Sequence, residues 1–446
     1  RFNFSHGDHE EHLQRLNKLK NVRDSMSHPV ATILDTKGPE IRIKSFQTKS
    51  ISLEAGDSFT LTTREVEGTN EIVSVTYPEL HQEVAQGQSI LIDDGLVALK
   101  VETIEGQDIR CSVENGGTLS NNKSINIPGV KIHLPALTEK DIRDIQFGVE
   151  QDFDFIAASF VRRAADVQAV RDVLNRFGGQ DVKIIAKIEN QEGVDNIDEI
   201  LTVADGVMVA RGDLGVEIPA AKVPMLQKQI IRKGLRLGKT VITATQMLDS
   251  MIRNPRPTRA EVSDVANAVF DGTSCVMLSG ETANGSYPVE ALQAMINIVE
   301  EAEQSIHYWR RFEKHMGVVA SNIDDAITHT SCLTAKDLDA KAILVATSSG
   351  HTAQMISRFR PACPVAALTM HEKVRRQLAI SWGIIPFLTG EVTSTDRIFS
   401  MSVEVALKER LVQNGDTVVI TAGVPLGRSG STNLIKAQIV NEKDLL

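Results

Sequence analysis

The sequence predicts an α/β protein whose largest part is built on a parallel sheet, and two observations carry that prediction. Short apolar runs alternate with segments of helical periodicity from about residue 135 onward, which is the pattern of βα units. Two of these runs also end in charge: residues 184–186 lead into Lys187 and Glu189, and residues 206–210 lead into Arg211 and Asp213. Because barrel enzymes carry their chemistry at the carboxyl ends of buried strands, we expect a (β/α)8 barrel, with a doubly wound open sheet as the second choice.

The expected barrel strands lie at residues 30–34, 155–160, 184–186, 206–210, 240–244 and 274–278, with the end of a further strand at Arg1. Helical stripes follow them, at residues 164–177, 196–204, 224–237 and 289–307 among others. Three helix starts carry a capping-box pattern, namely Asp8 with Glu11, Thr138 with Asp141, and Thr258 with Glu261. This count falls one strand short of eight, so we expect the first barrel strand to precede Arg1.

The barrel is expected to be discontinuous, covering residues 1–38 and 135–310. Between these parts, residues 39–134 contain short alternating segments separated by Gly, Asp and Asn, at 50–53, 59–62, 72–75, 89–92, 97–102 and 108–112. This pattern indicates a small inserted β-barrel domain, and an insertion on a barrel loop is well placed to act as a lid.

A separate C-terminal α/β domain with a mostly parallel sheet is expected at residues 315–446. Its strands are predicted at 342–347, 365–368, 384–388, 417–421 and 434–439, and its helices at 323–336, from 351, at 373–381 and at 395–413. Two loops of this domain, residues 347–352 and 428–432, are small and polar. Each alone is an ordinary turn, but the pair in one domain favours an anion site.

Composition narrows the class of protein. The chain has 446 residues, 42% hydrophobic and 24% charged, which is ordinary for a globular protein. A formal net charge of −10 argues against nucleic acid or an anionic membrane as the main partner. The four cysteines are scattered, and no apolar run reaches about eighteen residues, so we expect a cytoplasmic protein.

The charged strand ends predict a metal and an anionic substrate. Lys187 and Glu189 are two residues apart on a strand, so they face the same side, and with Asp213 they offer two hard carboxylates beside a cation. A simple ion pair is the plainer interpretation of Lys187 and Glu189. The histidines at positions 6, 9 and 12 could also suggest a metal, but the polar start of a helix explains them better.

Six blocks of this sequence resemble pyruvate kinase, in that family's order and over essentially the full chain. They are residues 1–7 (RFNFSHG), 34–42 (LDTKGPEIR), 184–190 (IIAKIEN), 208–215 (MVARGDLG), 244–247 (ATQM) and 278–283 (LSGETA). The resemblance implies transfer of the phosphoryl group of phosphoenolpyruvate to ADP, giving pyruvate and ATP in glycolysis.

By this resemblance, Glu189 and Asp213 hold Mg²⁺ or Mn²⁺, and Lys187 neutralises the phosphoryl group in flight. Phosphoryl transfer asks mainly for such positioning and electrostatics. The substrate-binding residues implied are Arg1, Gly212, Asp213 and Thr245, and the nucleotide-binding residues are His6, Arg42 and Lys123. Proton delivery to the enolate is implied for Thr245 or for a water relay through Ser279 and Glu281. We favour the relay, because an unaided hydroxyl is a weak acid.

The resemblance further implies K⁺ held by Asn3, Ser5, Asp35 and Thr36, with Glu40 matching the residue associated with K⁺ dependence. It implies a phosphorylated allosteric effector held by Thr347, Ser348, Ser349, Gly350, His351, Thr352 and Arg428, and a homotetramer. The family's aromatic sugar contact is not evident near residues 425–428, so the effector's identity stays open.

Two other classes remain as alternatives at this point. A metal-dependent aldolase or lyase on a phosphoenolpyruvate/pyruvate barrel could share the Glu189 and Asp213 pair, but it would not need the β insertion or Lys123. A non-catalytic or truncated inactive form is the other alternative. A non-catalytic regulatory protein would be expected to have lost Lys187 or a metal ligand, and this chain retains both.

Overall fold

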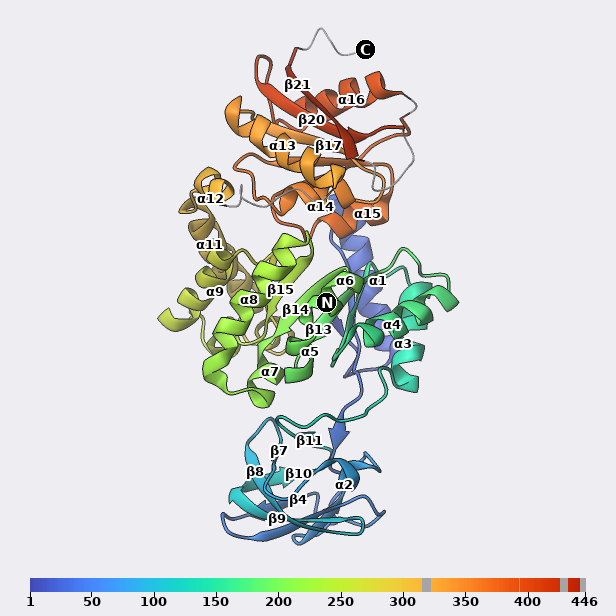
Figure 1. Ribbon diagram of the computed structural model, residues 1–446, viewed down its shortest axis with the longest axis vertical. Helices are drawn as coiled ribbons and strands as arrows, with labels where there is room; N and C mark the ends of the chain where they lie inside the picture. Colours follow the sequence, from blue (N-terminus) through green and yellow to red (C-terminus); the bar gives the residue numbers. More distant parts are fainter. Residues whose placement is uncertain (315–321, 393, 426–431, 442–446) are drawn as a thin grey trace.

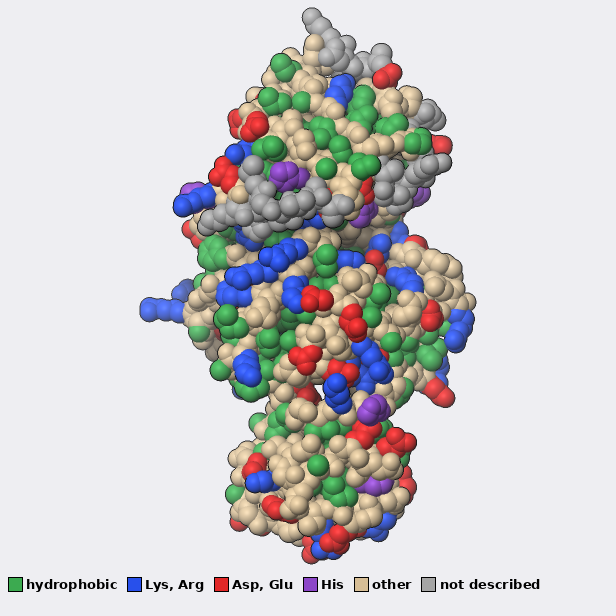
Figure 2. Space-filling model, viewed as in Figure 1, with side chains coloured by type: hydrophobic (Ala, Val, Ile, Leu, Met, Phe, Trp, Pro, Cys, Tyr) green, Lys and Arg blue, Asp and Glu red, His purple; other side chains and the backbone are tan. Residues whose placement is uncertain are grey.

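Three bodies follow one another along the long axis of the molecule (Figure 1). The computed structural model describes residues 1–314, 322–392, 394–425 and 432–441. A β-rich body lies at one end, the α/β body that carries the N-terminus lies in the middle, and the C-terminal α/β body lies at the other end. The molecule narrows where the β-rich body meets the central one (Figure 2).

The central body holds a seven-stranded sheet in the order β1-β2-β12-β13-β14-β15-β16, and every neighbouring pair is parallel. Its strands are β1 (Phe2–Asn3), β2 (Ile33–Asp35), β12 (Phe155–Ala158), β13 (Lys183–Ile188), β14 (Gly206–Ala210), β15 (Thr240–Ala244) and β16 (Cys275–Met277). Six of these are the strands predicted from the apolar runs, and β1 lies just after Arg1, where the end of a further strand was predicted. An eighth strand is not found in this sheet among the residues that the structure describes.

Helices connect these strands and cover the sheet (Figure 1). They are α1 (His9–Met26), α3 (Glu139–Glu150), α4 (Ala164–Arg176), α5 (Gln191–Asp195), α6 (Ile197–Val203), α7 (Arg211–Glu217), α8 (Val223–Arg236), α9 (Arg259–Asp271), α10 (Gly280–Ala283) and α11 (Pro288–Gln304). The capping boxes at Thr138 and Thr258 are confirmed. At α1, Asp8 accepts from the backbone N–H of Glu11, but the Glu11 carboxylate faces Arg15 at 3.6 Å, so the predicted box is only half formed.

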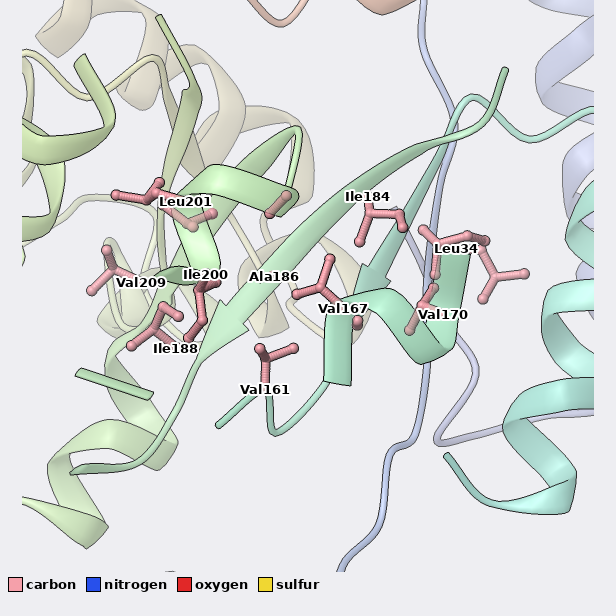
Figure 3. Close-up of a cluster of buried hydrophobic side chains, with 14 of the residues drawn as sticks. Leu34, Val161, Val167, Val170, Ile184, Ala186, Ile188, Ile200, Leu201 and Val209 are labelled. Carbon is pink, nitrogen blue, oxygen red and sulfur yellow. The ribbon is translucent and has the colours of Figure 1, made fainter. Parts of the chain in front are cut away.

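Strands β12, β13, β14 and β15 are buried on both faces, which sets where each of their side chains points. On β13, Ile184, Ala186 and Ile188 pack against Val167 and Val170 of α4 and Leu201 of α6 in the cluster drawn in Figure 3. Ile185 lies on the opposite face, in a second cluster with Met208 and Ile242. Because side chains alternate along a strand, Lys187 shares the face of Ile185 and points to the inside of the sheet's curve.

The β-rich body contains a sheet ordered β3-β11-β7-β8-β9-β5-β6 and a two-stranded sheet of β10 and β4. The strands are β3 (Ile41–Arg42), β4 (Ser50–Leu53), β5 (Ser58–Thr62), β6 (Ile72–Ser74), β7 (Ser89–Ile92), β8 (Val97–Glu105), β9 (Asp108–Asn115), β10 (Gly117–Ser120) and β11 (Ser124–Asn126), and a short helix α2 covers Leu80–Glu83. The six predicted strands are all present. Sequence patterns missed β3, β10 and β11, which are short and partly polar.

The C-terminal body has a five-stranded sheet ordered β19-β18-β17-β20-β21, parallel except for the last pair. Its elements are α13 (Ile323–Asp337), β17 (Ala342–Ala346), α14 (His351–Ser357), β18 (Val365–Thr369), α15 (Glu372–Leu378), β19 (Ile384–Leu388), α16 (Thr395–Lys408), β20 (Thr417–Gly423) and β21 (Thr432–Ile439), after α12 (Tyr308–Lys314). Helix α16 ends five residues before the predicted Gln413, because Arg410 has φ of 58°, a left-handed conformation that a helix cannot continue through.

The C-terminal body is joined to the amino ends of the barrel strands, which is the edge opposite the charged residues. Arg376 of α15 donates to Asp154 at 2.8 Å and to Asp152 at 2.7 Å, and Gln377 donates to the carbonyls of Asp154 and Asp181. The carboxyl edge therefore faces the β-rich body and leaves room for a site. No described helix is both long enough and apolar enough to cross a bilayer.

Candidate active site

The charged residues predicted at the strand ends converge at one edge of the parallel sheet. Asp35 ends β2, Ser159 follows β12, Lys187 and Glu189 lie at the end of β13, and Asp213 lies in the first turn of α7 after β14. The carboxyl ends of parallel strands meet at a common edge, so residues far apart in sequence come within bonding distance of one another. The edge is the candidate active site.

Lys187 is the buried centre of this edge, with 9% of its surface exposed. Its Nζ lies 2.8 Å from Ser159 Oγ, 3.0 Å from Glu189 Oε1 and 3.1 Å from Asp35 Oδ1. Burial lowers the pKa of Lys187, but Asp35 and Glu189 outweigh burial and hold the pKa above its ordinary value. The lysine is therefore a fixed positive charge in a site that excludes most water.

Asp35 shares this charge with Arg1, whose Nε lies 2.5 Å from Asp35 Oδ2. Complete burial raises the pKa of Asp35, yet the Lys187 and Arg1 charges outweigh it and hold the pKa below its ordinary value. Asn3 is aligned with Asp35 on the neighbouring strand. Its Oδ1 accepts from the N–H of Ser5, and Thr36 Oγ1 accepts from the N–H of Ser159. Asn3, Asp35 and Thr36 thus supply oxygen atoms from the ends of two neighbouring strands, with a permanent negative charge on Asp35.

Glu189, which is buried, and Asp213, which is half-buried, form a carboxylate pair beside Lys187. Glu189 is 1% exposed, and its Oε2 accepts from the backbone N–H of Phe160 at 2.6 Å. Burial first, and the neighbouring Glu189 second, raise the pKa of Asp213 to about 7. Two carboxylates that resist simultaneous ionisation are an arrangement that a hard divalent cation relieves. Within the described parts of the chain, no three His, Cys, Asp or Glu side chains form a complete cage.

Arg211 organises the next loop and does not point at the site. It donates to the carbonyls of Ala244 and Thr245, at 3.3 and 2.7 Å, and lies 2.7 Å from Asp264 on α9. Thr245 has φ of 68°, a left-handed conformation that these bonds help to hold. These contacts give Arg211 a structural role in holding the loop that follows β15.

Thr245 and Gly212 contact each other directly. The backbone N–H of Gly212 donates to Thr245 Oγ1 at 2.7 Å, and the Thr245 hydroxyl donates to the Ala244 carbonyl at 2.6 Å. The N–H of Gly212, one of the residues implied to contact the substrate, is thus bonded to the threonine in this arrangement. If a substrate carboxylate accepted this hydrogen bond instead, Thr245 Oγ1 would be free to accept another one.

Glu281 and Ser279 lie on the neighbouring turn after β16. Glu281 is 1% exposed, and its carboxylate accepts from the N–H of Leu248 at 3.0 Å and of Ser279 at 2.7 Å. The Ser279 Oγ is buried and has no partner among the described residues. A buried hydroxyl of this kind normally bonds an ordered water, which is what a proton relay through Ser279 requires.

The predicted nucleotide residues are spread over two bodies. His6 is exposed on the loop before α1. Arg42 begins the β-rich body, where it lies 2.5 Å from Glu40, and Lys123 pairs with Asp93 at 2.9 Å. A cavity of about 200 Å³ separates this body from the barrel, and Asp94, Asn126, Asp213 and Glu217 are among its lining residues. The two bodies meet where Asn126 donates to Glu217 at 2.9 Å.

The polar loop expected to bind an effector joins β17 to α14, at residues 347–352. Thr347 Oγ1 accepts from the N–H of Gly350 at 2.9 Å, and Gly350 has φ of 85°, so the loop turns tightly into the helix. Thr352 lies 2.6 Å from Thr432 through their hydroxyls, and His351 lies 3.4 Å from Asp324. Ser348 and Ser349 lie at the loop's bend. Arg428 is outside the described residues.

Sequence patterns missed Ser159, Asn126 and Glu217. The predicted strand ran to Phe160 and so concealed Ser159, although a polar residue at the carboxyl end of a barrel strand is a signal that the same rule could have used. The contact between Asn126 and Glu217 joins two bodies and has no signal in the sequence. The histidines at 6, 9 and 12 have separate surroundings: His9 contacts Asp144 at 2.7 Å, and His12 stacks on Phe4.

A parallel barrel that places a buried lysine beside a carboxylate pair, next to a β-rich body, is typical of an enzyme that handles an anionic substrate with a metal. Comparison with known proteins identifies the family. Residues 1–292 match the family described as pyruvate kinase, barrel domain, and residues 325–438 match pyruvate kinase, alpha/beta domain. The chain belongs to the pyruvate kinase family.

Individual relatives agree with this assignment. The chain is 52% identical to the pyruvate kinase of Clostridium acetobutylicum over 441 residues, covering 99% of this chain and 93% of the relative. It is 51% identical to that of Geobacillus stearothermophilus over 444 residues, covering 99% and 76%. A solved pyruvate kinase from Cryptosporidium parvum superposes with a TM-score of 0.93 at 40% identity, covering 98% of this chain and 90% of that one.

The enzyme is a phosphotransferase that moves the phosphoryl group of phosphoenolpyruvate to ADP, giving pyruvate and ATP, and the family depends on metal. The predicted fold class, a barrel with a C-terminal α/β domain, is confirmed. The aldolase or lyase alternative does not fit membership in this family.

Proposed function

We propose that Glu189 and Asp213 hold Mg²⁺ or Mn²⁺, and that Lys187 is the central catalytic charge. The observation that carries this proposal is the position of the Lys187 ammonium, 3.0 Å from Glu189 Oε1 and buried at the carboxyl edge. When bound, the divalent ion would polarise phosphoryl oxygens and offset their charge. Lys187 would bond the transferring phosphoryl group, whose charge is spread over its oxygens in the transition state.

Substrate contacts are proposed for Arg1, Gly212, Asp213 and Thr245. Arg1 already lies against Asp35, so its guanidinium is held at the edge where a phosphate would lie. The Gly212 N–H would turn from Thr245 to the substrate carboxylate, and Thr245 would then bond the substrate beside it. Nearby backbone N–H groups suit a carboxylate because they need no reorganisation.

The proton needed by the enolate carbon is proposed to arrive through water held by Ser279, with Glu281 as the positioning residue. The unpartnered and buried Ser279 Oγ supports this path, because it leaves a hydroxyl free to bond water. Thr245 is the second candidate donor. Its proton is bonded to the Ala244 carbonyl, which makes direct donation less favourable than the relay.

A K⁺ ion is proposed at Asn3, Ser5, Asp35 and Thr36, with Glu40 favouring K⁺ dependence. All four ligands are oxygen donors, and the lowered pKa of Asp35 keeps one full negative charge among them. His6, Arg42 and Lys123 are proposed to bind the nucleotide as residues 39–134 close on the barrel of residues 1–38 and 135–310. The contact of Asn126 with Glu217 supports such closure.

The loop of residues 347–352, in the domain of residues 315–446, is proposed to bind a phosphorylated effector, with Arg428 as a further contact. A homotetramer is proposed as well. Exposed Val262, Val289, Leu292 and Ile296 on α9 and α11 support an interface there. A cytoplasmic location is proposed, supported by four free cysteines.

A coupled assay of pyruvate formation from phosphoenolpyruvate and ADP tests the metal assignments. We expect turnover to require a divalent ion, to rise with K⁺ relative to Na⁺, and to need a higher divalent-ion concentration in Glu189→Gln. Turnover that persists in excess chelator, or that responds equally to K⁺ and Na⁺, would contradict them.

A further inference from the structure

A basic cavity of about 820 Å³ lies between the barrel and the C-terminal body. Its walls come from α8, the end of α9, α12, and the residues that follow α14. Figure 2 shows basic side chains gathered on the barrel just below the C-terminal body. None of the lining residues belongs to the candidate active site or to the loop of residues 347–352, so the cavity is a separate feature of the molecule.

The charge around the cavity is strongly positive in a chain whose net charge is −10. Five arginines line it, at positions 232, 236, 310, 311 and 358, against a single carboxylate, Asp271. That carboxylate is already paired, because Lys228 Nζ lies 2.5 Å from Asp271 Oδ1. The lining therefore carries a surplus of positive charge that its own carboxylate does not offset.

Two of the arginines have a structural explanation. Arg311 donates to the carbonyls of Phe270 and Asp271, at 3.2 and 3.3 Å, and so caps the end of α9. Arg358 donates to the carbonyl of Arg236 at 3.3 Å, at the end of α8, and pairs with Asp325 at 2.7 Å. Cations at helix carboxyl ends are stabilising, so these two need no ligand.

The other three arginines lack such an explanation. In the described ranges of the chain, the guanidinium groups of Arg232, Arg236 and Arg310 have no carboxylate or carbonyl partner. Arg232 and Arg236 are four residues apart on α8, so they lie on one helix face and repel each other. A ligand with several negative charges would offset this repulsion, and guanidinium groups suit phosphate because they bond it in pairs.

The cavity also contains apolar surface and, within the described part of the chain, buried polar atoms without a partner. Leu235, Phe270 and Phe359 contribute apolar surface. Two buried polar atoms in the lining, Arg358 Nε and Asp271 Oδ2, have no partner among the described residues. One is a donor and the other an acceptor, so a ligand with phosphate and hydroxyl groups could satisfy both. A volume of this size suits a small organic molecule.

We propose that this cavity binds a small organic phosphate carrying at least two phosphate charges. Arg232, Arg236 and Arg310 hold its phosphate oxygens, and Leu235, Phe270 and Phe359 contact its carbon skeleton. Because Arg358 and Phe359 come from the C-terminal body and the other lining residues from the barrel side, an occupied cavity joins the two bodies.

Isothermal titration of the full chain with inorganic pyrophosphate, in chelator, tests the site. We expect binding in wild type that weakens at least about tenfold in the variant Arg232→Ala, Arg236→Ala, Arg310→Ala. The matched control neutralises exposed arginines elsewhere, in Arg15→Ala, Arg143→Ala, Arg176→Ala, and is expected to keep wild-type affinity.

Pyrophosphate could also enter the other two anion sites, so two further variants separate them. Ser348→Ala with Ser349→Ala alters the C-terminal loop, and Lys187→Met alters the active site. Both are expected to keep the binding event that the cavity variant loses. The melting temperature without ligand shows whether each variant is folded.

The proposal is overturned if the folded cavity variant binds pyrophosphate as wild type does, if the exposed-arginine control loses as much affinity, or if wild type does not bind it. A single binding event that disappears in the loop or active-site variant would also overturn it.

Discussion

The ammonium of Lys187 lies 3.0 Å from Oε1 of Glu189, and both side chains are buried at the carboxyl edge of the barrel. Lys187 is the last but one residue of β13, and the alternate side chains of this strand pack outward against helices, so the lysine points to the interior. The pair therefore brings a permanent cation to a metal-binding carboxylate. Four predictions follow from this edge and from the interface on the opposite side.

Replacing Lys187 with Met should lower turnover by at least about a hundredfold while leaving nucleotide binding intact, because a preorganised charge on the transferring group is lost. Steady-state rates at saturating substrates and titration of ADP measure the two effects. Lys18→Met on the exposed face of α1 is the control. Near-normal turnover of the Lys187 variant would remove its catalytic role.

Changing Glu189 to Gln should raise the divalent-ion concentration needed for half-maximal rate by about tenfold or more, because one of two proposed hard ligands loses its charge. Asp24→Asn, which changes an exposed carboxylate near the end of α1, is the control. The dependence of rate on Mg²⁺ concentration gives the answer. An unchanged half-saturation value would place the ion elsewhere.

The pKa of Asp213, raised to about 7, predicts how the metal-free protein responds to pH. An unfolded aspartate has a pKa near 4, so the folded protein binds more protons between about pH 4 and 7 and loses stability as pH rises through that range. Asp213→Asn removes this loss. The melting temperature of the variant, relative to wild type in chelator, should therefore increase from about pH 5 to about pH 8.

Asp24→Asn is the matched control for this experiment, and its melting-temperature difference from wild type should be constant with pH. The Asp213→Asn variant could also differ from wild type by a constant melting temperature, or by one that decreases toward high pH. Either result would show that the Asp213 carboxyl group titrates in its ordinary range.

Removing Arg376 should destabilise the protein by about 3–5 kcal/mol, because the fully buried Asp154 carboxylate would lose its charge partner. Burial raises the pKa of Asp154 even with the arginine present. Denaturant unfolding of Arg376→Ala measures the loss, with exposed Lys408→Ala on α16 as control. The double variant Arg376→Ala, Asp154→Asn should recover part of the lost stability. If the stability losses of the two single variants simply added in the double variant, Arg376 and Asp154 would not interact.

Much of the fold could be read from local patterns. Apolar runs predicted six of the seven barrel strands, and Thr138 and Thr258 marked two helix starts through bonds that span only three residues. Such features are local, so the sequence contains them in full. The short strands β3, β10 and β11 escaped because they are held by neighbouring strands more than by their own side chains. The end of α16 was predicted too late because the left-handed conformation of Arg410 has no clear signal in the sequence.

For the site, the sequence by itself determined the chemical groups: a lysine and a carboxylate two residues apart, a second carboxylate after the next strand, and the family to which they belong. Tertiary structure alone decided how these groups behave. Asp35 and Ser159 reach Lys187 from strands 152 and 28 residues away, and only their approach in a buried place shifts the pKa values of Lys187 and Asp35. Charge interactions depend on the distance between the charged groups and on their burial, and the amino-acid sequence alone specifies neither quantity.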